Sequence, residues 1–393
     1  MKSLVVKIQK AWRMWRRSGF LGGIKIGFGY VATFFRAFFV GSGDVLFISS
    51  GVGDAAYYRT HNVAEELGLH GFRASTTISD NPFLPKLVDK FQIFVFQRVV
   101  VNKNVKEAIR RIKQQKKEII FETDDLVYDP KYLKYMDYFQ RISPAEQEEY
   151  KNGIGAEIVD DPYVKVCTTT VAYLAEKLRE KGKRVIIVPN KFSEYELELA
   201  DKIIKKQKIS DGFVKIIYSS GTLSHNKDFA TIKNVLADIL KKHKNAKLLL
   251  MGPLDIPNDI SLPKGQVEII PRVSRDELYT QLYRADINLV PLEIGNPFCE
   301  SKSAIKFTEA AVVGVPSVVV RNQTFSEAVK DGVDGFLADN PEEWKDKIER
   351  LIENEKLRKE IGKNAREKVI KMYSNRNSRN DEYYEYLKNK MKS

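Results

Sequence analysis

Short apolar runs alternate with amphipathic stretches along most of this chain, and this alternation restricts the possible folds more than any other feature. In the first half, patterns with helical spacing lie near residues 55–70, 103–115 and 171–181. The apolar runs around them are DVLFISS (44–50), QIFVF (92–96), EIIFE (118–122), VKVCTTT (164–170) and RVIIVP (184–189). Nearly continuous apolar strands are typical of parallel sheets that helices cover on both faces. We therefore predict a doubly wound α/β domain.

The second half repeats the pattern after PNKFSEYELELA (189–200), which we interpret as a linker and hinge. Its apolar runs are VKIIYSS (214–220), AKLLLMG (246–252), QVEIIP (266–271), DINLVP (286–291) and SVVV (317–320). Its helical patterns lie near residues 228–243, 275–284, 302–313 and 341–372. We predict two consecutive α/β domains, over residues 41–195 and 196–372. Ligands of such sheets bind beyond the carboxyl ends of the strands, so the expected site is a cleft between the domains.

Residues 1–40 combine basic and aromatic side chains and form a separate N-terminal extension. A helix over residues 2–17 would carry an apolar side of Leu4, Val5, Ile8, Ala11, Trp12 and Trp15. Its other sides would carry Lys7, Lys10, Arg13, Arg16 and Arg17. Helices of this kind lie in the headgroup region of anionic membranes. We predict peripheral attachment to the membrane; the alternative is an ordinary helix that packs on the first domain.

The formal net charge of +13 favours anionic partners: phosphates, nucleic acid or a membrane surface. The basic residues form no recognised nucleic-acid-binding motif, so no nucleic acid is expected. Two cysteines, Cys167 and Cys299, imply no disulfide framework and fit the cytoplasm. None of the four histidines stands at metal-ligand spacing from Cys, Asp or Glu, so no metal is expected. The longest apolar candidate, residues 26–35, is shorter than the roughly 20 residues that span a bilayer.

The stretch NPFCESKSAIKFTEAAVVGVPSVVV (296–320) carries the strongest chemical signal. The expected N-caps of its helix are Ser301 and Ser303. Lys302, Lys306 and Glu309 then share one helix face. Two lysines near a helix N-terminus can bind a diphosphate, and a carboxylate two turns later can accept hydrogen bonds from a ribose diol. The alternative is a solvated face with an ordinary Lys306–Glu309 ion pair.

A second candidate is YSSGTLSHNKDF (218–229), which leads from the first strand of the second domain into a helix. The small residues up to Gly221 and Thr222 allow close approach of a phosphate to the backbone. Lys227 could add positive charge. The alternative is a plain strand-to-helix loop capped by Asn226 or Asp228.

Two further stretches follow strands of the first domain. SSGVGDAAYYRTHN (49–62) contains G-x-G-x-x-A from Gly51 to Ala56, but lacks the acidic residue that a dinucleotide site needs about 20 positions on. A tight turn explains its glycines, and Arg59 is a candidate anion contact or a plain surface arginine. In ETDDLVYDP (122–130), the carboxylates could bind sugar hydroxyls or assist proton removal, or could simply cap the loop.

Together these stretches resemble the family 4 glycosyltransferases, whose GT-B fold has two Rossmann-like domains facing across a cleft. The resemblance covers residues 44–373 and is more specific in the second half. There it rests on SKSAIKFTEAAVVGVPSVVV, SGTLSHNKDFATI, DINLVPLE, NPF and DGVDGFL. In the first half, DVLFISS, YYRTHNVAEEL, FETDDLVYDP and VAYLAEKLREKGKRVIIVPNKF look similar to bacterial members that act on surface polysaccharides. In similar proteins the final segment, here residues 373–393 with a helix at 378–390, returns to the N-terminal domain.

The resemblance implies a nucleotide-sugar site in the second domain. Glu309 is similar to the family's ribose-binding glutamate, and Lys227 to a lysine that contacts the diphosphate. The implied donor-binding residues are Gly221, Thr222, Lys227, Lys302, Ser303, Ala304, Ile305, Lys306 and Glu309. Many members carry an arginine at the position of Thr222, and here Lys302 or Lys306 would supply that charge. The family's earlier glutamate falls on Ser301, with Glu300 beside it.

The implied catalytic residues are Glu300, Lys306 and Asp124. The expected acceptor side of the first domain holds Gly53, Arg59, Asp124 and Asp125. The resemblance thus implies a retaining glycosyltransferase that moves a sugar from a nucleoside-diphosphate sugar to a glycan or lipid-linked acceptor. The expected setting is polysaccharide synthesis on the cytoplasmic face of the cell membrane, with neither metal nor cofactor. Two other classes stay open: an NAD(P)-linked enzyme, from the glycine turn, and a non-catalytic protein that binds anions or nucleic acid, from the charge.

Overall fold

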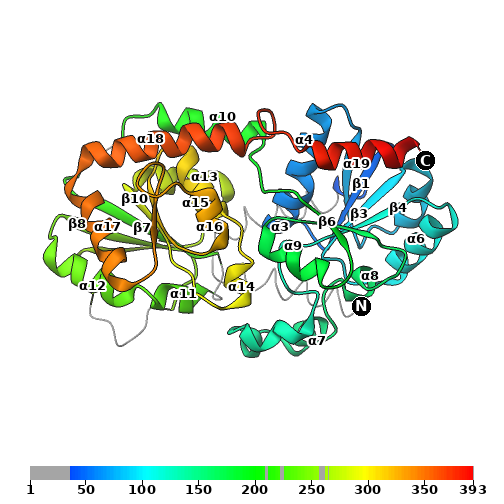
Figure 1. Cartoon of the computed structure of the whole chain (residues 1–393), viewed down its shortest axis with the longest axis horizontal. Helices are drawn as coiled ribbons and strands as arrows, with labels where there is room; N and C mark the ends of the chain where they lie inside the picture. Colours follow the sequence, from blue (N-terminus) through cyan, green and yellow to red (C-terminus); the bar gives the residue numbers. More distant parts are fainter. Residues whose placement is uncertain (1–35, 209–210, 222–224, 256–261, 264, 393) are drawn as a thin grey trace. The chain divides into compact units, whose positions relative to one another are not determined.

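The computed structural model describes residues 36–208, 211–221, 225–255, 262–263 and 265–392 of the 393-residue chain. The predicted membrane helix over residues 2–17 lies outside the described residues. The chain divides into two compact units (Figure 1). Unit 1 takes in the described residues up to Ser193, residues 301–303 and those from Asn375 on, while unit 2 comprises residues 194–300 and 304–374.

Unit 1 contains a six-stranded parallel sheet in the order β2-β1-β3-β4-β5-β6. Its strands are β1 (Val45–Ser49), β2 (Ala74–Ile78), β3 (Ile93–Gln97), β4 (Glu118–Glu122), β5 (Val166–Thr169) and β6 (Arg184–Ile187). Its α-helices are α3 (Asp54–Ala56), α4 (Asn62–Leu69), α5 (Leu84–Leu87), α6 (Lys103–Gln114), α7 (Pro144–Lys151), α8 (Ala156–Val159), α9 (Ala172–Arg179) and α19 (Asp381–Lys392). A π-helical segment, η1 (Tyr57–His61), joins α3 to α4. All five residues of β1 and of β3 are buried, as the apolar runs predict.

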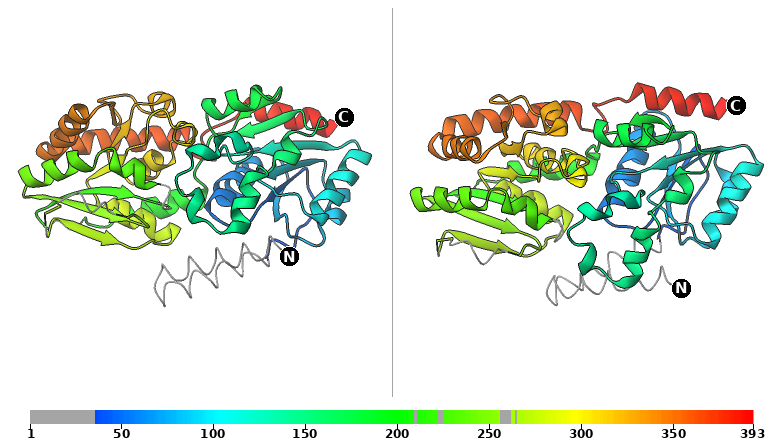
Figure 2. Two further views of the ribbon diagram at one scale, coloured as in Figure 1. Left: turned by 90° about the horizontal axis from the view of Figure 1, so that it is seen from below. Right: turned by 60° about the horizontal axis from the view of Figure 1, so that its bottom comes forward.

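The last helix of the chain, α19, completes the core of unit 1. Tyr383, Tyr384 and Leu387 are buried in one apolar cluster with residues of β1, β3 and α4. In both views of Figure 2, α19, in red, lies beside the blue and cyan segments of this unit. Polar contacts fix it as well, because buried Glu66 binds the Tyr384 hydroxyl and lies 2.6 Å from Lys191 Nζ.

Unit 2 contains a second six-stranded parallel sheet, in the order β12-β11-β10-β7-β8-β9. Its strands are β7 (Val214–Ser219), β8 (Ala246–Met251), β9 (Val267–Ile270), β10 (Ile287–Val290), β11 (Ser317–Val320) and β12 (Phe336–Ala338). Its helices are α10 (Glu194–Ile204), α11 (Asn226–Ala230), α12 (Lys233–Lys242), α13 (Arg275–Arg284), α14 (Pro297–Glu300), α15 (Ile305–Val312), α16 (Gln323–Ala328), α17 (Pro341–Glu353) and α18 (Glu355–Met372). The predicted fold class, two Rossmann-like α/β domains with separate parallel sheets, is confirmed.

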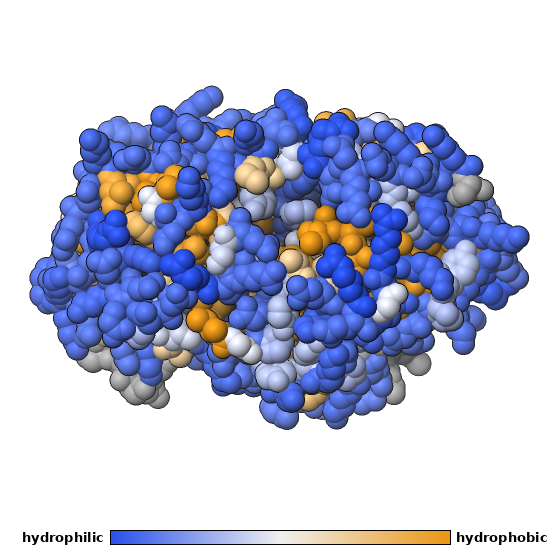
Figure 3. Space-filling model, in the orientation of Figure 1, coloured by the Kyte–Doolittle hydropathy of each residue, from blue (hydrophilic) through white to orange (hydrophobic). Residues whose placement is uncertain are grey.

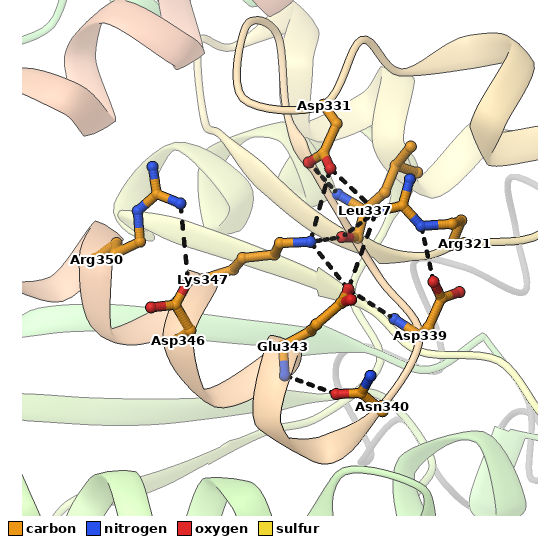
Figure 4. Close-up of polar contacts among 9 residues, drawn as sticks. All are labelled: Arg321, Asp331, Leu337, Asp339, Asn340, Glu343, Asp346, Lys347 and Arg350. Carbon is orange, nitrogen blue, oxygen red and sulfur yellow. Dashed lines mark hydrogen bonds and ion pairs between the residues drawn. The ribbon is translucent and has the colours of Figure 1, made fainter.

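An ion-pair network holds β12 to α17 (Figure 4). Arg321 lies 2.9 Å from a carboxylate oxygen of Asp339 and 3.1 Å from one of Asp331. Lys347 on α17 lies 3.0 Å from a Glu343 carboxylate oxygen and also binds the carbonyl oxygen of Leu337. These contacts fix the rotation of α17 about its own axis.

Three local predictions differ from the structure. The segment interpreted as a linker becomes α10 from Glu194 on, because its apolar positions pack as one helix face with Ala200 and Ile203 buried. The long pattern over residues 341–372 is two helices, since the Asn354 side chain accepts a hydrogen bond from the backbone N–H of Leu357 and caps α18. Two strands, β2 and β12, were not predicted.

The face of the molecule drawn in Figure 3 is mostly hydrophilic. On the face in Figure 3, apolar residues form a few separate areas among hydrophilic ones. No helix in the described part of the chain combines the length and apolar character needed to cross a membrane.

Candidate functional site

A row of buried polar side chains crosses the carboxyl edge of the unit 1 sheet. Ser49, Gln97, Glu122 and Thr168 are register partners on four neighbouring strands, β1, β3, β4 and β5. Register partners in a parallel sheet point to the same face. Each of the four is at most 2% exposed. An apolar sheet that ends in such a row presents hydrogen-bonding groups where ligands of α/β folds bind.

Arg59 is buried against this row and binds its member Glu122, so it is not a surface residue. Its Nε and Nη2 donate to the two carboxylate oxygens of Glu122 at 2.8 and 3.1 Å. Its Nη1 donates to the carbonyl oxygen of Val188 at 2.7 Å and to Asn190 Oδ1 at 2.9 Å. Arg59 is 1% exposed and lies in η1, a helix form that is frequent at functional sites. The expectation of a direct contact between Arg59 and the acceptor is therefore wrong in this structure, because the hydrogen-bond donors of the buried guanidinium bind Glu122, Val188 and Asn190.

Burial and ion pairing act against each other in the Arg59–Glu122 pair. Desolvation raises the pKa of Glu122, while Arg59 and a hydrogen bond from Thr168 act to lower it. Burial opposes the charge of Arg59 too, yet Glu122 and Asp124 raise its pKa overall. Two fully buried charges persist only when each satisfies the other, so this pair fixes β4 against η1.

Asp124, a predicted catalytic residue, lies just beyond β4 and is paired with Arg98. Arg98 Nη1 is 3.1 Å from Asp124 Oδ1, and both side chains are about one-fifth exposed. Burial opposes ionisation of Asp124, but Arg98 and Arg59 lower its pKa overall. Such a carboxylate accepts hydrogen bonds from hydroxyl groups well, but it is a weak general base. The geometry thus favours hydroxyl binding over proton removal.

The backbone near Arg98 is strained. Its φ of 49° falls in a region that non-glycine residues rarely occupy, and residues with such strained backbone cluster at functional sites.

Of the other acceptor-side candidates, Gly53 is exposed in the turn before α3, and Asp125 lies 3.6 Å from Lys302 Nζ. Ser303 Oγ accepts a hydrogen bond from Asn190 at 3.0 Å. Lys302 and Ser303, predicted on the donor helix, thus belong to unit 1.

The loops after β7 and β8 pack closely at the carboxyl edge of the unit 2 sheet. Gly252 has a φ of +88°, and a Cβ there would lie 1.9 Å from the carbonyl oxygen of Ser220. Only glycine permits this approach, which fixes the backbone just before the donor candidate Gly221. Lys227 is exposed in α11, and Thr222 lies outside the described residues.

The helix with the strongest sequence signal, α15, begins later than predicted. Its N-cap is Ala304, whose side chain cannot cap, so the expected caps Ser301 and Ser303 are wrong. Asn288, buried on β10, donates to the carbonyl oxygen of Lys306 at 3.1 Å and to Ser317 Oγ at 3.0 Å. The first turn, with Ile305 and Lys306, is therefore anchored to two strands.

Lys306 points inward from α15. Its Nζ is shielded from solvent and lies 5.4 Å from the ring centre of Tyr218. Glu309, one turn later, is partly buried. The far end of α15 is fixed by Arg366 Nε, 3.0 Å from the carbonyl oxygen of Val312. The alternative of a solvated helix face does not fit a lysine whose charge is buried.

Asp228, which was predicted only as a possible helix cap, connects the loops of unit 2. Its Oδ2 lies 2.7 Å from His225 Nδ1. Its Oδ1 accepts from the backbone N–H of Glu293 at 3.1 Å and from Cys299 Sγ at 3.3 Å. Burial opposes its ionisation, but His225 and Lys306 help to lower its pKa. One buried carboxylate thus joins the segments that follow β7 and β10.

Glu300, the other predicted catalytic residue, is the last residue of α14. Its Oε1 accepts a hydrogen bond from the backbone N–H of Gly295 at 3.0 Å, which closes the loop before the helix. The Asn296 side chain donates to Glu293 at 2.9 Å in the same loop. Glu300 therefore shapes this loop, with one carboxylate oxygen engaged by the backbone.

Comparison with known proteins gives a family match for part of the chain. Residues 200–368 match the model of the family described as Glycosyl transferases group 1. An uncharacterized glycosyltransferase of Methanocaldococcus jannaschii is 35% identical over 109 residues, which are 26% of this chain and 28% of that protein. The match thus spans less than a third of the length of this curated relative.

Solved structures show the same fold over most of the chain. HepE of Anabaena, in complex with UDP-glucose, matches with a TM-score of 0.59 and 13% identity, over 88% of this chain and 100% of that one. A glycosyltransferase from Rickettsia africae matches with a TM-score of 0.60 and 14% identity, over 90% and 100%. These likenesses establish the fold, and the family match covers the residues around α15. Residues 200–368 thus resemble the glycosyl transferases group 1 family, and most of the chain has the fold of these solved structures.

Proposed function

We propose that this protein is a retaining glycosyltransferase that moves a sugar from a nucleoside-diphosphate sugar to a glycan or lipid-linked acceptor. The observation that carries the proposal is the family match over residues 200–368, since it contains α15 and the loops that Asp228 connects. The relative from Methanocaldococcus jannaschii, itself described as a glycosyltransferase, supports the same activity.

The donor part of the proposal rests on the charges around α15. Lys306 and Lys227 would neutralise the diphosphate, with the backbone of Ala304 and Ile305 beside it. Glu309 would accept hydrogen bonds from the ribose. Negative charge grows on the leaving diphosphate as the glycosidic bond breaks, and fixed positive charges stabilise it. Because Asn288 anchors the backbone of Lys306, this charge would need little rearrangement during the reaction.

The acceptor part rests on unit 1. The carboxylates of Asp124 and Asp125 would bind acceptor hydroxyl groups, and Arg59 would hold the edge of the sheet in place through Glu122. Asp124 would remain ionised near neutral pH because its pKa is lowered.

A screen of nucleotides by thermal unfolding tests the donor class. UDP-sugars come first, since the HepE structure of the same fold was solved with UDP-glucose. A ligand that binds only the folded state raises the melting temperature. We expect a rise with at least one nucleoside-diphosphate sugar and its free diphosphate, and none with NADH. A rise with NADH alone would instead favour the NAD(P)-linked alternative.

We further propose that residues 1–40 hold the enzyme on an anionic membrane, where polysaccharide acceptors linked to lipid are made. Phe39, at the end of this segment, is 86% exposed, which leaves an aromatic side chain for the membrane interface. Each basic residue near anionic lipid adds about 1 kcal/mol to binding, and salt weakens the effect.

Sedimentation with vesicles tests the membrane proposal. The full-length protein should pellet with anionic vesicles at low salt, and Arg16→Gln combined with Arg17→Gln should reduce the pelleted fraction. A matched control, Lys356→Gln with Lys359→Gln on α18, removes the same charge elsewhere and should pellet like the native protein. Equal loss in both double variants would show that net charge alone drives the binding.

A further inference from the structure

We propose that His243, Glu349 and Glu353 form a binding site for a divalent transition-metal ion such as Zn²⁺. One ligand atom from each residue lies within 4.8 Å of the others. His243 follows α12, and the two glutamates are four residues apart on α17, so they share one face of that helix. His243 lies more than one hundred positions from the two glutamates in sequence, which is why histidine spacing did not reveal them.

The spacing of the three groups fits ligands that share one ion. His243 Nε2 lies 3.4 Å from Glu349 Oε1 and 3.8 Å from Glu353 Oε1. Zinc bonds of about 2.0–2.2 Å in a tetrahedron place neighbouring ligand atoms roughly 3.3 Å apart. His243 Nε2 and Glu349 Oε1 are both buried, and their separation is long for a direct hydrogen bond. Two buried polar atoms this close together can share one ion.

Neighbouring side chains hold two of the ligands in position. Lys242 Nζ lies 2.7 Å from Glu349 Oε2, which leaves the other oxygen, Oε1, directed at His243. Gln266 Nε2 donates to the carbonyl oxygen of His243 at 3.0 Å. The network in Figure 4 fixes α17 itself through Glu343 and Lys347, which precede Glu349 on the same helix. Such outer-shell contacts orient the ligands of metal sites.

The chemistry of the three ligands selects the class of ion. An imidazole nitrogen with two carboxylates suits Zn²⁺ and its neighbours better than Mg²⁺ or Ca²⁺, which prefer oxygen ligands alone. The side chains of His243 and Glu349 are only 11% and 15% exposed, while that of Glu353 is 60% exposed. The site is therefore open on the Glu353 side, where an ion can enter and a water molecule can complete the tetrahedron.

The site is separate from the proposed donor residues. In a parallel α/β sheet each crossover helix runs from the carboxyl edge back to the amino edge. His243 stands after α12 and shortly before β8, so it lies at the amino edge. Lys227 and Gly221 follow β7 at the opposite edge. A bound ion would thus cross-link α12 and α17 and stabilise unit 2 without entering the reaction.

Zinc titration of the full chain, freed of metal by a chelator, tests the site. We expect one equivalent of Zn²⁺ to bind in calorimetry and to raise the melting temperature, and Mg²⁺ to have no such effect. His243→Gln and Glu353→Gln should each weaken zinc binding at least about tenfold, since loss of an outer-shell partner alone has that effect. Glu353 is exposed, so its substitution leaves the fold intact and keeps the test decisive.

Glu342→Gln is the matched control, because it removes the same charge from an exposed position in the first turn of α17. It should bind zinc like the native protein. Absence of zinc binding by the native chain would overturn the proposal. Unchanged zinc affinity in both His243→Gln and Glu353→Gln would overturn it too, because the ion would then lie elsewhere and the three residues would be an ordinary ion-pair cluster.

Discussion

We expect Glu309→Ala and Lys306→Ala each to reduce donor binding and sugar transfer roughly ten- to a hundredfold, while the protein remains folded. A charge-assisted hydrogen bond to a ligand contributes about 1.5–3 kcal/mol, which corresponds to this range. Alanine is the best helix former, and the anchors of α15 at Asn288 and Arg366 act on backbone carbonyl groups. The changes therefore remove the two side chains and leave the helix in place.

Donor affinity by calorimetry, turnover with a labelled sugar, and the melting temperature together check this prediction. The matched control is Lys359→Ala with Glu355→Ala, which removes an exposed ion pair of α18 in the same unit. The control should bind and transfer like the native protein. If the double change of Lys306 and Glu309 preserves donor affinity and turnover, the two residues do not form the donor site.

Arg59→Met should destabilise the protein by about 3–5 kcal/mol, because it leaves the carboxylate of Glu122 buried without its charge partner. Both side chains are almost fully buried, at 1% and 2% exposure, and two hydrogen bonds join them. Urea unfolding measures the effect as a lower midpoint. The double variant Arg59→Met with Glu122→Gln should recover part of the loss, since no buried charge is then unpaired.

An exposed pair of the same chemistry provides the control. Arg110 donates two hydrogen bonds to Glu107 on the surface of α6. Arg110→Met should change the unfolding midpoint very little, because exposed pairs contribute little to stability. Similar midpoints for Arg59→Met and Arg110→Met would contradict the inferred role of the buried pair.

The strands that the sequence revealed and those it concealed differ in their surroundings. Central strands such as β3 and β10 are buried along their whole length and are apolar except for Gln97 and Asn288. The two strands that were missed, β2 and β12, lie at the sheet edges. β2 reads ASTTI and is only partly buried, and β12 has three residues. Neither strand has an apolar run long enough to distinguish it from a loop by sequence alone.

The sequence suggests site residues where they lie close together along the chain. Lys306 and Glu309 were predicted because helical spacing places them on one face, and their roles stay predictions. Asp228 acts through contacts with Glu293 and Cys299, which lie more than sixty positions away, so no local pattern signals its role. Arg59 was predicted to be an anion contact or a plain surface arginine, because nothing near it in sequence signals a buried charge partner. That partner, Glu122, lies more than sixty positions away at the end of β4.

The placement of α19 in unit 1 affects the order in which the chain can fold during synthesis. Tyr383, Tyr384 and Leu387 fill the core beside β1 and β3, yet the ribosome makes them after the whole of unit 2. Unit 2, residues 194–300 and 304–374, is complete in sequence before then. Domains usually fold in the order in which they are made, but here unit 1 can complete its core only after unit 2 has been made. A chain that stops before Tyr383 would carry a complete unit 2 and a unit 1 with an open core, which is a target for chaperones and proteases.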